Sequence, residues 1–311
     1  MLQVETTSGI CQCFCMSKPI LISLLLMVPG QSLAQEGFEA DLMQPCLAGP
    51  GLAHACYPGA QGNGLVFATS VNWAHHLLKL HDDENDTPGT WLVEDRVTVS
   101  TAMGFRYESG FRFSIGLDWI ARQQGQQTDG VGAPMDMATG MGKSWIQSSV
   151  DLLRHPNINV SMETGLVFPS PNPSILAAPG RVRWKMGLRA SLNFWLLHPL
   201  LAVGVRFGEN QNFSDITRDN SIYWDTAIEV TKSSWMWGVF VEAFGITRMS
   251  TPFSSRANDY SEALAGARIR LLDDLEIVVG ASMGIRGPGA PLIRPMAVFR
   301  IFPEKITLEN E

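Results

Sequence analysis

The chain has 311 residues, a formal net charge of −7 and a mean hydropathy of +0.05. The negative charge argues against nucleic-acid binding, which requires a basic face. No apolar run is long enough for a membrane helix, so the chain could cross a membrane only with the strands of a closed barrel.

The N-terminal region resembles an export signal. Residues 20–28 form the most apolar run, Lys18 places a positive charge before it, and residues 32–34 form a small-x-small cleavage site. We therefore expect an over-long translation start at residues 1–15 and a signal peptide at residues 16–34. The alternative interpretation of the apolar run is a buried helix.

Two cysteines remain after the expected cleavage, Cys46 and Cys56, in a segment rich in glycine and proline. An exported chain meets an oxidising periplasm, where thiols pair. We expect a Cys46–Cys56 disulfide within a periplasmic N-terminal segment, residues 35–64, that precedes the barrel.

Residues 182–194 show the alternation that identifies the fold class. Trp184, Met186 and Leu188 belong to the apolar parity, and Arg183 and Lys185 to the polar one. Successive side chains of a strand face opposite ways, so each parity forms one face. Soluble sandwiches also alternate, but their strands usually run to about 5–6 residues, whereas membrane strands of about ten are normal.

Twelve segments with this periodicity can be laid out between residues 65 and 302. Their connections alternate long and short, as in an up-and-down barrel with long outer loops and tight periplasmic turns. The sequence predicts an all-β fold, a transmembrane up-and-down antiparallel β-barrel of about twelve strands over residues 65–302, with a C-terminal tail at residues 303–311. The alternative is a large periplasmic β-sandwich. The expected strands are residues 65–73, 91–105, 111–121, 144–153, 157–168, 182–194, 200–207, 221–231, 234–246, 262–271, 275–285 and 292–302.

The charged residues of these segments fall on the parity opposite the apolar one. A charge that faces lipid at the middle of the bilayer costs about 2–4 kcal/mol, so placement in a membrane enforces this segregation. The candidate lumen-facing residues are Arg112, Asp118, Glu163, Arg183, Lys185, Arg189, Arg206, Asp225, Glu229, Glu242, Arg268, Arg270, Glu276 and Arg286. Arg300 is an exception, because it interrupts the apolar parity of the closing strand.

Other motifs give little support for chemistry. His75, His76 and the acidic residues 81–86 could bind a divalent cation, but on an outer loop a solvated acidic tip is the simpler interpretation. No histidine has a recognisable serine partner for hydrolysis. We therefore predict no catalytic site, no metal site and no cofactor.

Residues 234–245 read SWMWGVFVEAFG, and residues 271–280 read LLDDLEIVVG, followed by a Gly-Pro-Gly-Ala-Pro turn at residues 287–291. These segments resemble the outer-membrane barrel family named for the MetA pathway of phenol degradation. The resemblance covers roughly residues 150–302 and implies passive transport of small, aromatic or hydrophobic compounds. It supplies no catalytic residues.

The sequence thus predicts a passive outer-membrane channel for small solutes, with outer-membrane lipids and a small-molecule solute as its partners. Two alternatives remain. One is a non-conducting barrel, in which the inner charges form a plug or the outer loops bind a surface partner, and the other is an outer-membrane enzyme.

Overall fold

The structure is a computed structural model. It describes residues 43–46, 52, 54, 56, 58, 64–79, 91–107, 109–125, 138–170, 176, 180–208, 211–213, 216–232, 235–253, 259–272, 274–287 and 289–303. The expected translation start, the signal peptide and most of the C-terminal tail lie outside these residues. Within them, no helix is long and apolar enough to cross a membrane.

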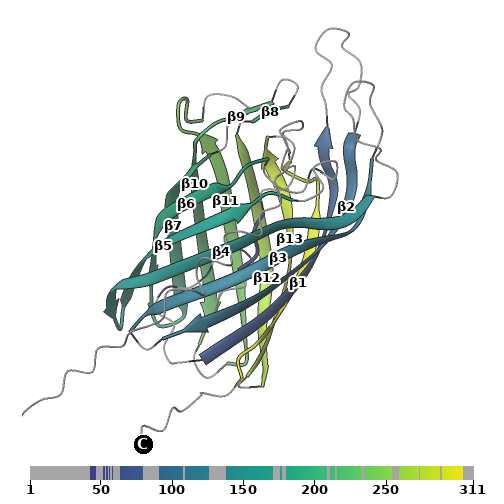
Figure 1. Cartoon of the computed structure of the whole chain (residues 1–311). Coiled ribbons are helices and arrows are strands. Elements are labelled where there is room, and N and C mark those ends of the chain that lie inside the picture. Colours follow the sequence, from purple (N-terminus) through teal and green to yellow (C-terminus); the bar gives the residue numbers. More distant parts are fainter. Residues whose placement is uncertain are drawn as a thin grey trace, which may run out of the picture. The chain divides into compact units, whose positions relative to one another are not determined.

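Twelve strands form a closed antiparallel barrel in which neighbours in the chain are neighbours in the sheet (Figure 1). The barrel closes where β14 pairs with β1, from Phe67 opposite Ile301 to Asn72 opposite Met296. The predicted fold class and strand number are confirmed. The barrel strands are β1 (Gly64–Lys79), β2 (Trp91–Arg106), β3 (Phe111–Gln124), β4 (Ala138–His155), β5 (Ile158–Phe168), β6 (Arg183–Leu192), β7 (Leu197–Phe207), β10 (Ser221–Thr231), β11 (Trp237–Arg248), β12 (Tyr260–Leu272), β13 (Leu275–Arg286) and β14 (Arg294–Ile301).

Short turns join the strands at one end of the barrel, called here the turn end, and longer connections join them at the loop end. The structure extends several strands further at the loop end than the periodicity predicted. β1 includes His75 and His76, which we had expected in a loop, and β4 begins at Ala138. A small hairpin, β8 (Gln211–Phe213) with β9 (Ile216–Arg218), lies in the connection between β7 and β10 and was not predicted.

The barrel is polar inside and apolar outside. Along β6, Trp184, Met186 and Leu188 are exposed, whereas Arg183, Lys185 and Arg189 are buried. The other strands follow the same rule, since the exposed large side chains are almost all apolar and many of the buried ones are charged. An outer surface of this kind suits hydrocarbon rather than water.

Glycines on the inner face make room for large aromatic side chains. A Cβ on Gly187 or Gly204 would lie 2.2 and 2.4 Å from the Tyr223 hydroxyl oxygen, and a Cβ on Gly116 would lie 2.3 Å from Trp145. Tyr223 therefore lies against β6 and β7, and Trp145 lies against β3. Trp145 is only 2% exposed. It faces the interior of the barrel.

The outer face gives a first prediction. Leu188 lies in the middle of β6 and is 49% exposed. We expect Leu188→Arg to lower the free energy of unfolding in lipid bilayers by about 2–4 kcal/mol, because an arginine there would face hydrocarbon. Denaturant titration in liposomes measures this change, with Leu188→Ala as the control for lost side-chain volume. Equal stability of the Arg and Ala variants would contradict a lipid-facing position.

Candidate functional site: the barrel lumen

The candidate lumen-facing residues all lie on the parity that points inward. Most of them are buried: Arg112, Asp118, Glu163, Arg183, Lys185, Arg189, Asp225, Glu229, Glu242 and Glu276. Arg206, Arg268 and Arg286 are half-buried, and Arg270 is exposed at the turn end. Basic residues predominate on β6 and β7, and acidic residues are most frequent on β10 to β13.

Six further charged residues that are buried in the described part of the chain were missed, among them Lys143 and Asp259. Arg96, Glu262, Arg294 and Arg300 are all almost completely buried. Arg300 does not break the pattern of β14, because the outward face of this strand carries Phe299 and Ile301 and the inward face carries Arg294, Met296, Val298 and Arg300. The two apolar residues on the inward face led us to assign the wrong parity.

Glu163 on β5 is the centre of one polar network. Its carboxylate oxygens accept hydrogen bonds from the Tyr223 hydroxyl at 2.8 Å and the Gln147 amide at 2.8 Å, and they pair with the Arg189 guanidinium at 2.7 Å. Tyr223 reaches this carboxylate from β10 across β6 and β7, which the glycines beneath its ring permit. One buried carboxylate on β5 thereby connects β4, β6 and the more distant β10.

A second network crosses β10 to β14. Arg268 pairs with Glu229 at 2.7 Å and with Glu276 at 3.3 Å, and Glu276 also accepts a hydrogen bond from Arg300. Near the loop end, Glu262 pairs with Arg294 at 3.0 Å and accepts a hydrogen bond from Ser282 at 2.6 Å. Buried charges are tolerated when they are paired and hydrogen-bonded in this way.

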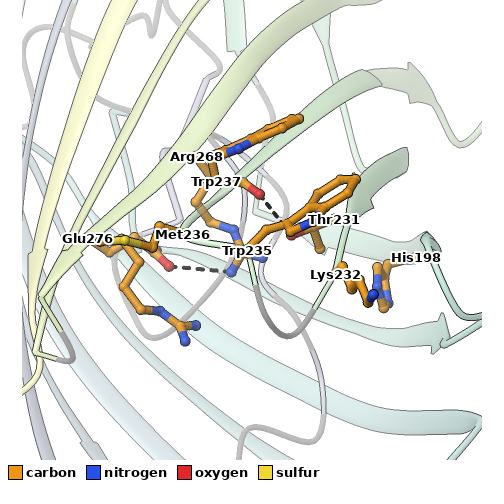
Figure 2. A pocket seen from close by; sticks show the side chains of 9 residues that line it. His198, Thr231, Lys232, Trp235, Met236, Trp237, Arg268 and Glu276 are labelled. Carbon is orange, nitrogen blue, oxygen red and sulfur yellow. Dashed lines mark hydrogen bonds and ion pairs between the residues drawn. The ribbon is translucent and has the colours of Figure 1, made fainter.

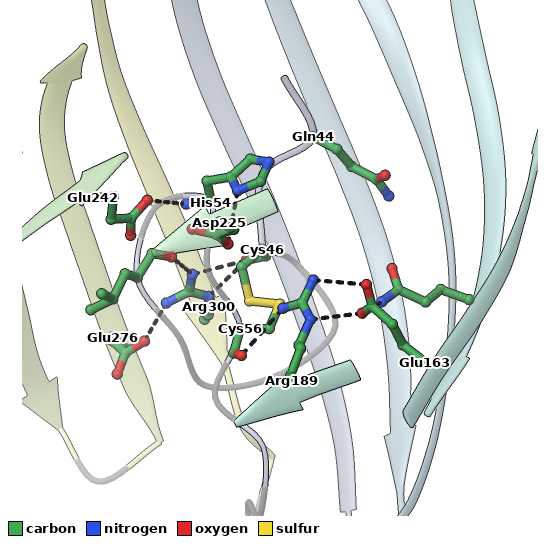
Figure 3. The surroundings of a disulfide bond; sticks show 12 residues. Gln44, Cys46, His54, Cys56, Glu163, Arg189, Asp225, Glu242, Glu276 and Arg300 are labelled. Carbon is green, nitrogen blue, oxygen red and sulfur yellow. Dashed lines mark hydrogen bonds and ion pairs between the residues drawn. A yellow bond between two sulfur atoms is a disulfide. The ribbon is translucent and has the colours of Figure 1, made fainter. Parts of the chain in front are cut away.

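The described residues between positions 43 and 58 contact the inner wall and are called here the luminal segment (Figure 3). Its backbone oxygens accept hydrogen bonds from the wall. Arg300 donates to the Cys46 oxygen at 2.8 Å and the Leu52 oxygen at 2.6 Å, and Arg189 donates to the Cys56 oxygen at 3.2 Å. Lys143 donates to the Met43 oxygen at 3.1 Å. Wall cations thus hold the segment through neutral oxygens.

His54 attaches the luminal segment to the acidic wall. Its backbone N–H donates to Glu242 at 3.0 Å, its ring Nδ1 lies 3.2 Å from Asp225, and its ring stacks on Phe244 with centroids 4.1 Å apart. A disulfide joins Cys46 to Cys56. We had expected this segment, which precedes the barrel strands in the chain, to lie in the periplasm. The contacts place its described residues inside the barrel instead, because they supply acceptors to cations of the inner wall.

Two cavities flank these groups. One lies between the luminal segment and the basic wall and has a volume of about 30 Å³, close to the space of a single water molecule. The other, about 160 Å³, lies at the turn end (Figure 2). Its lining includes His198, Lys232, Arg268 and Glu276, beside the turn that carries the stacked rings of Trp235 and Trp237.

The histidine cluster of the sequence analysis is only partly described. His75 Nδ1 lies 2.8 Å from Asp95, and the His76 ring stacks on Trp91. Residues 81–86 lie outside the described part of the chain. Within that described part, no three His, Cys, Asp or Glu side chains form a group that could hold a metal ion.

Comparison with known proteins gives the class of the fold. No family model matches the chain, that of the phenol-degradation family included, and no curated protein sequence matches it. An outer-membrane channel from Pseudomonas putida F1 superimposes with a TM-score of 0.55 at 11% identity, covering 80% of this chain and 100% of that chain. The NanC porin superimposes with a TM-score of 0.50 at 9% identity, covering 77% and 100%. The chain therefore has the fold of outer-membrane porins.

The Glu262–Arg294 pair gives a second prediction, since both side chains are 0% exposed. We expect Arg294→Met to destabilise the barrel by about 3–5 kcal/mol, because it leaves a buried carboxylate without its cation. The double variant Arg294→Met/Glu262→Leu should recover most of this loss. Equilibrium unfolding of both variants in liposomes checks the pair, and additive effects of the two substitutions would show that the residues do not interact.

Proposed function

We propose that the protein is a passive channel for small polar solutes in the outer membrane. The observation that carries the proposal is the inner face of the barrel, which is lined along its length by ionisable side chains of both signs. Charged rings and clusters of this kind determine which solutes pass through a pore. Aromatic or hydrophobic cargo, which the sequence resemblance implies, is less favoured by such a lining.

The luminal segment makes the channel narrow. A barrel of twelve strands lies between about eight strands, whose interior is filled by side chains, and about 16–18 strands, whose lumen is open. Here the segment occupies part of the interior, and the cavity that remains beside the basic wall is too small for an organic solute. Passage of an organic solute along the basic wall would therefore require that the segment move.

The competing functions lack a comparable observation. A non-conducting barrel would also pair its inner charges, so only a transport measurement separates it from a channel. A hydrolase would need a nucleophile with a base in hydrogen-bond reach. His198 and His54 contact Asn193 and Asp225 among the described residues, and neither contacts a serine.

Single-channel recording in planar bilayers, with swelling of liposomes in neutral sugars, tests the proposal. We expect small conductance from the oxidised protein and larger conductance after reduction of the Cys46–Cys56 disulfide, because the opened loop leaves the lumen more easily. Labelling of the unfolded, unreduced protein should find neither cysteine free. The absence of conductance and swelling in both redox states would contradict the channel and favour the non-conducting barrel.

Ion selectivity gives a further prediction. Replacing basic residues of the inner wall with glutamine should shift selectivity toward cations, because a fixed positive field favours anions. Replacing the acidic residues Asp225, Glu229 and Glu242 with their amides should shift it the other way. Reversal potentials in a salt gradient measure both shifts, and equal selectivity in the two sets would contradict a conducting path along these residues. The basic set is Arg183, Lys185, Arg189 and Arg206.

A further inference from the structure

We propose that Lys185, together with Arg189 and Arg206, binds the oxyanion group of a small solute, and that this binding displaces the luminal segment. The inference rests on the proposed channel function and names the chemistry of its solute. The site lies on the inner wall, at the cavity between the basic strands β6 and β7 and the luminal segment.

Lys185 is a buried cation whose acceptors are both neutral. Its Nζ donates to the side-chain oxygen of Gln44 at 3.3 Å and to that of Gln147 at 3.2 Å. Among the described residues, no carboxylate lies within ion-pair distance of this Nζ. Buried lysines are rare without a paired carboxylate, so two amide oxygens are an unusual set of partners for an ammonium group.

The cross-strand neighbour of Lys185 is a second cation. Arg206 is its direct cross-strand partner on β7, and both side chains face inward. Like charges directly opposite each other in a sheet are destabilising. Arg189 lies on the same strand as Lys185 and also faces inward. Glu163 accepts hydrogen bonds from Arg189 and Tyr223, and it is the one carboxylate among the described residues that line this cavity. Lys185 and Arg189 thus line this cavity beside a single carboxylate of the described residues.

An oxyanion would be a better acceptor for Lys185 and Arg189 than the luminal segment is. An ionised oxygen adds a charge–charge attraction to the hydrogen bond from an ammonium or guanidinium group, and a neutral amide or carbonyl oxygen does not. The segment offers only amide and carbonyl oxygens to these cations, at Gln44 for Lys185 and at Cys56 for Arg189. A carboxylate or phosphate would replace these neutral acceptors with charged ones.

Binding and displacement are coupled by the available volume. The cavity at this site has room for about one water molecule, and Gln44, Cys46, His54 and Cys56 form one side of it. An oxyanion-bearing solute fits only when the segment withdraws. A ligand that binds only the displaced state shifts the equilibrium toward that state by its differential affinity. The solute itself would thus open the channel.

The test uses the full-length mature protein with its disulfide intact, in planar bilayers at fixed ionic strength. Succinate and inorganic phosphate are the anionic probes, and sucrose is the neutral one. We expect the fraction of time in the open state to rise and saturate with the anions and to remain constant with sucrose. A response to both anions would show that the site binds oxyanions generally. A response to only one would identify a carboxylate or a phosphate as the group that it binds.

Variants of one residue locate the effect. Lys185→Gln should raise the half-maximal anion concentration by about tenfold or more, because a charge-assisted hydrogen bond is lost. Lys185→Arg should restore the response. Arg122→Gln is the matched control, since it removes one positive charge from an exposed side chain that donates to Gln124 on its own strand. An unchanged response in Lys185→Gln, or an equal loss in Arg122→Gln, would overturn the site.

A second readout separates this inference from the channel function. In the Cys56→Ser variant the remaining thiol, Cys46, is 2% exposed in the structure. Succinate or phosphate should accelerate its labelling by a membrane-impermeant maleimide several-fold. Accelerated labelling in a barrel that never conducts would support the site and overturn the channel. Conductance without any response of labelling or opening to either anion would overturn the site and leave the channel standing.

Discussion

The structure depends on one constraint, the placement of most ionisable side chains of the strands on the inner face of the barrel. Strand geometry gives each residue only two directions, and hydrocarbon on the outside excludes charge from one of them. The interior must then satisfy a high density of buried charge. The networks around Glu163, Glu262 and Glu276 meet that requirement by pairing each carboxylate with a cation on another strand.

The luminal segment completes these networks. Arg300 pairs with Glu276 and also donates to the backbone oxygens of Cys46 and Leu52. Backbone carbonyls are suitable acceptors because they carry no net charge and leave the ion pairs intact. The same neutrality allows the attachment to be displaced, since an ionised oxygen would add a charge–charge attraction to the same cations.

Sequence periodicity predicted the barrel strands well and the position of the luminal segment poorly. The twelve barrel strands and the inward parity of residues such as Arg183 and Glu242 follow from local alternation, which a chain in a bilayer cannot violate without cost. β14 was harder, because Met296 and Val298 share the inward face with Arg294 and Arg300, so both faces contain apolar residues. The position of the luminal segment depends on contacts such as that between Cys46 and Arg300, 254 residues apart, and no local pattern encodes them.

The most direct test of the account measures which way the side chains of one strand face. Spin labels placed singly along β6, from Arg183 to Leu192, report collisions with oxygen, which dissolves in lipid, and with a water-soluble nickel complex. In bilayers we predict oxygen accessibility with a period of two residues and maxima at Trp184, Met186, Leu188 and Ala190. Maxima of nickel accessibility at these same positions, or oxygen accessibility without a period of two, would contradict a barrel that is apolar outside and charged within.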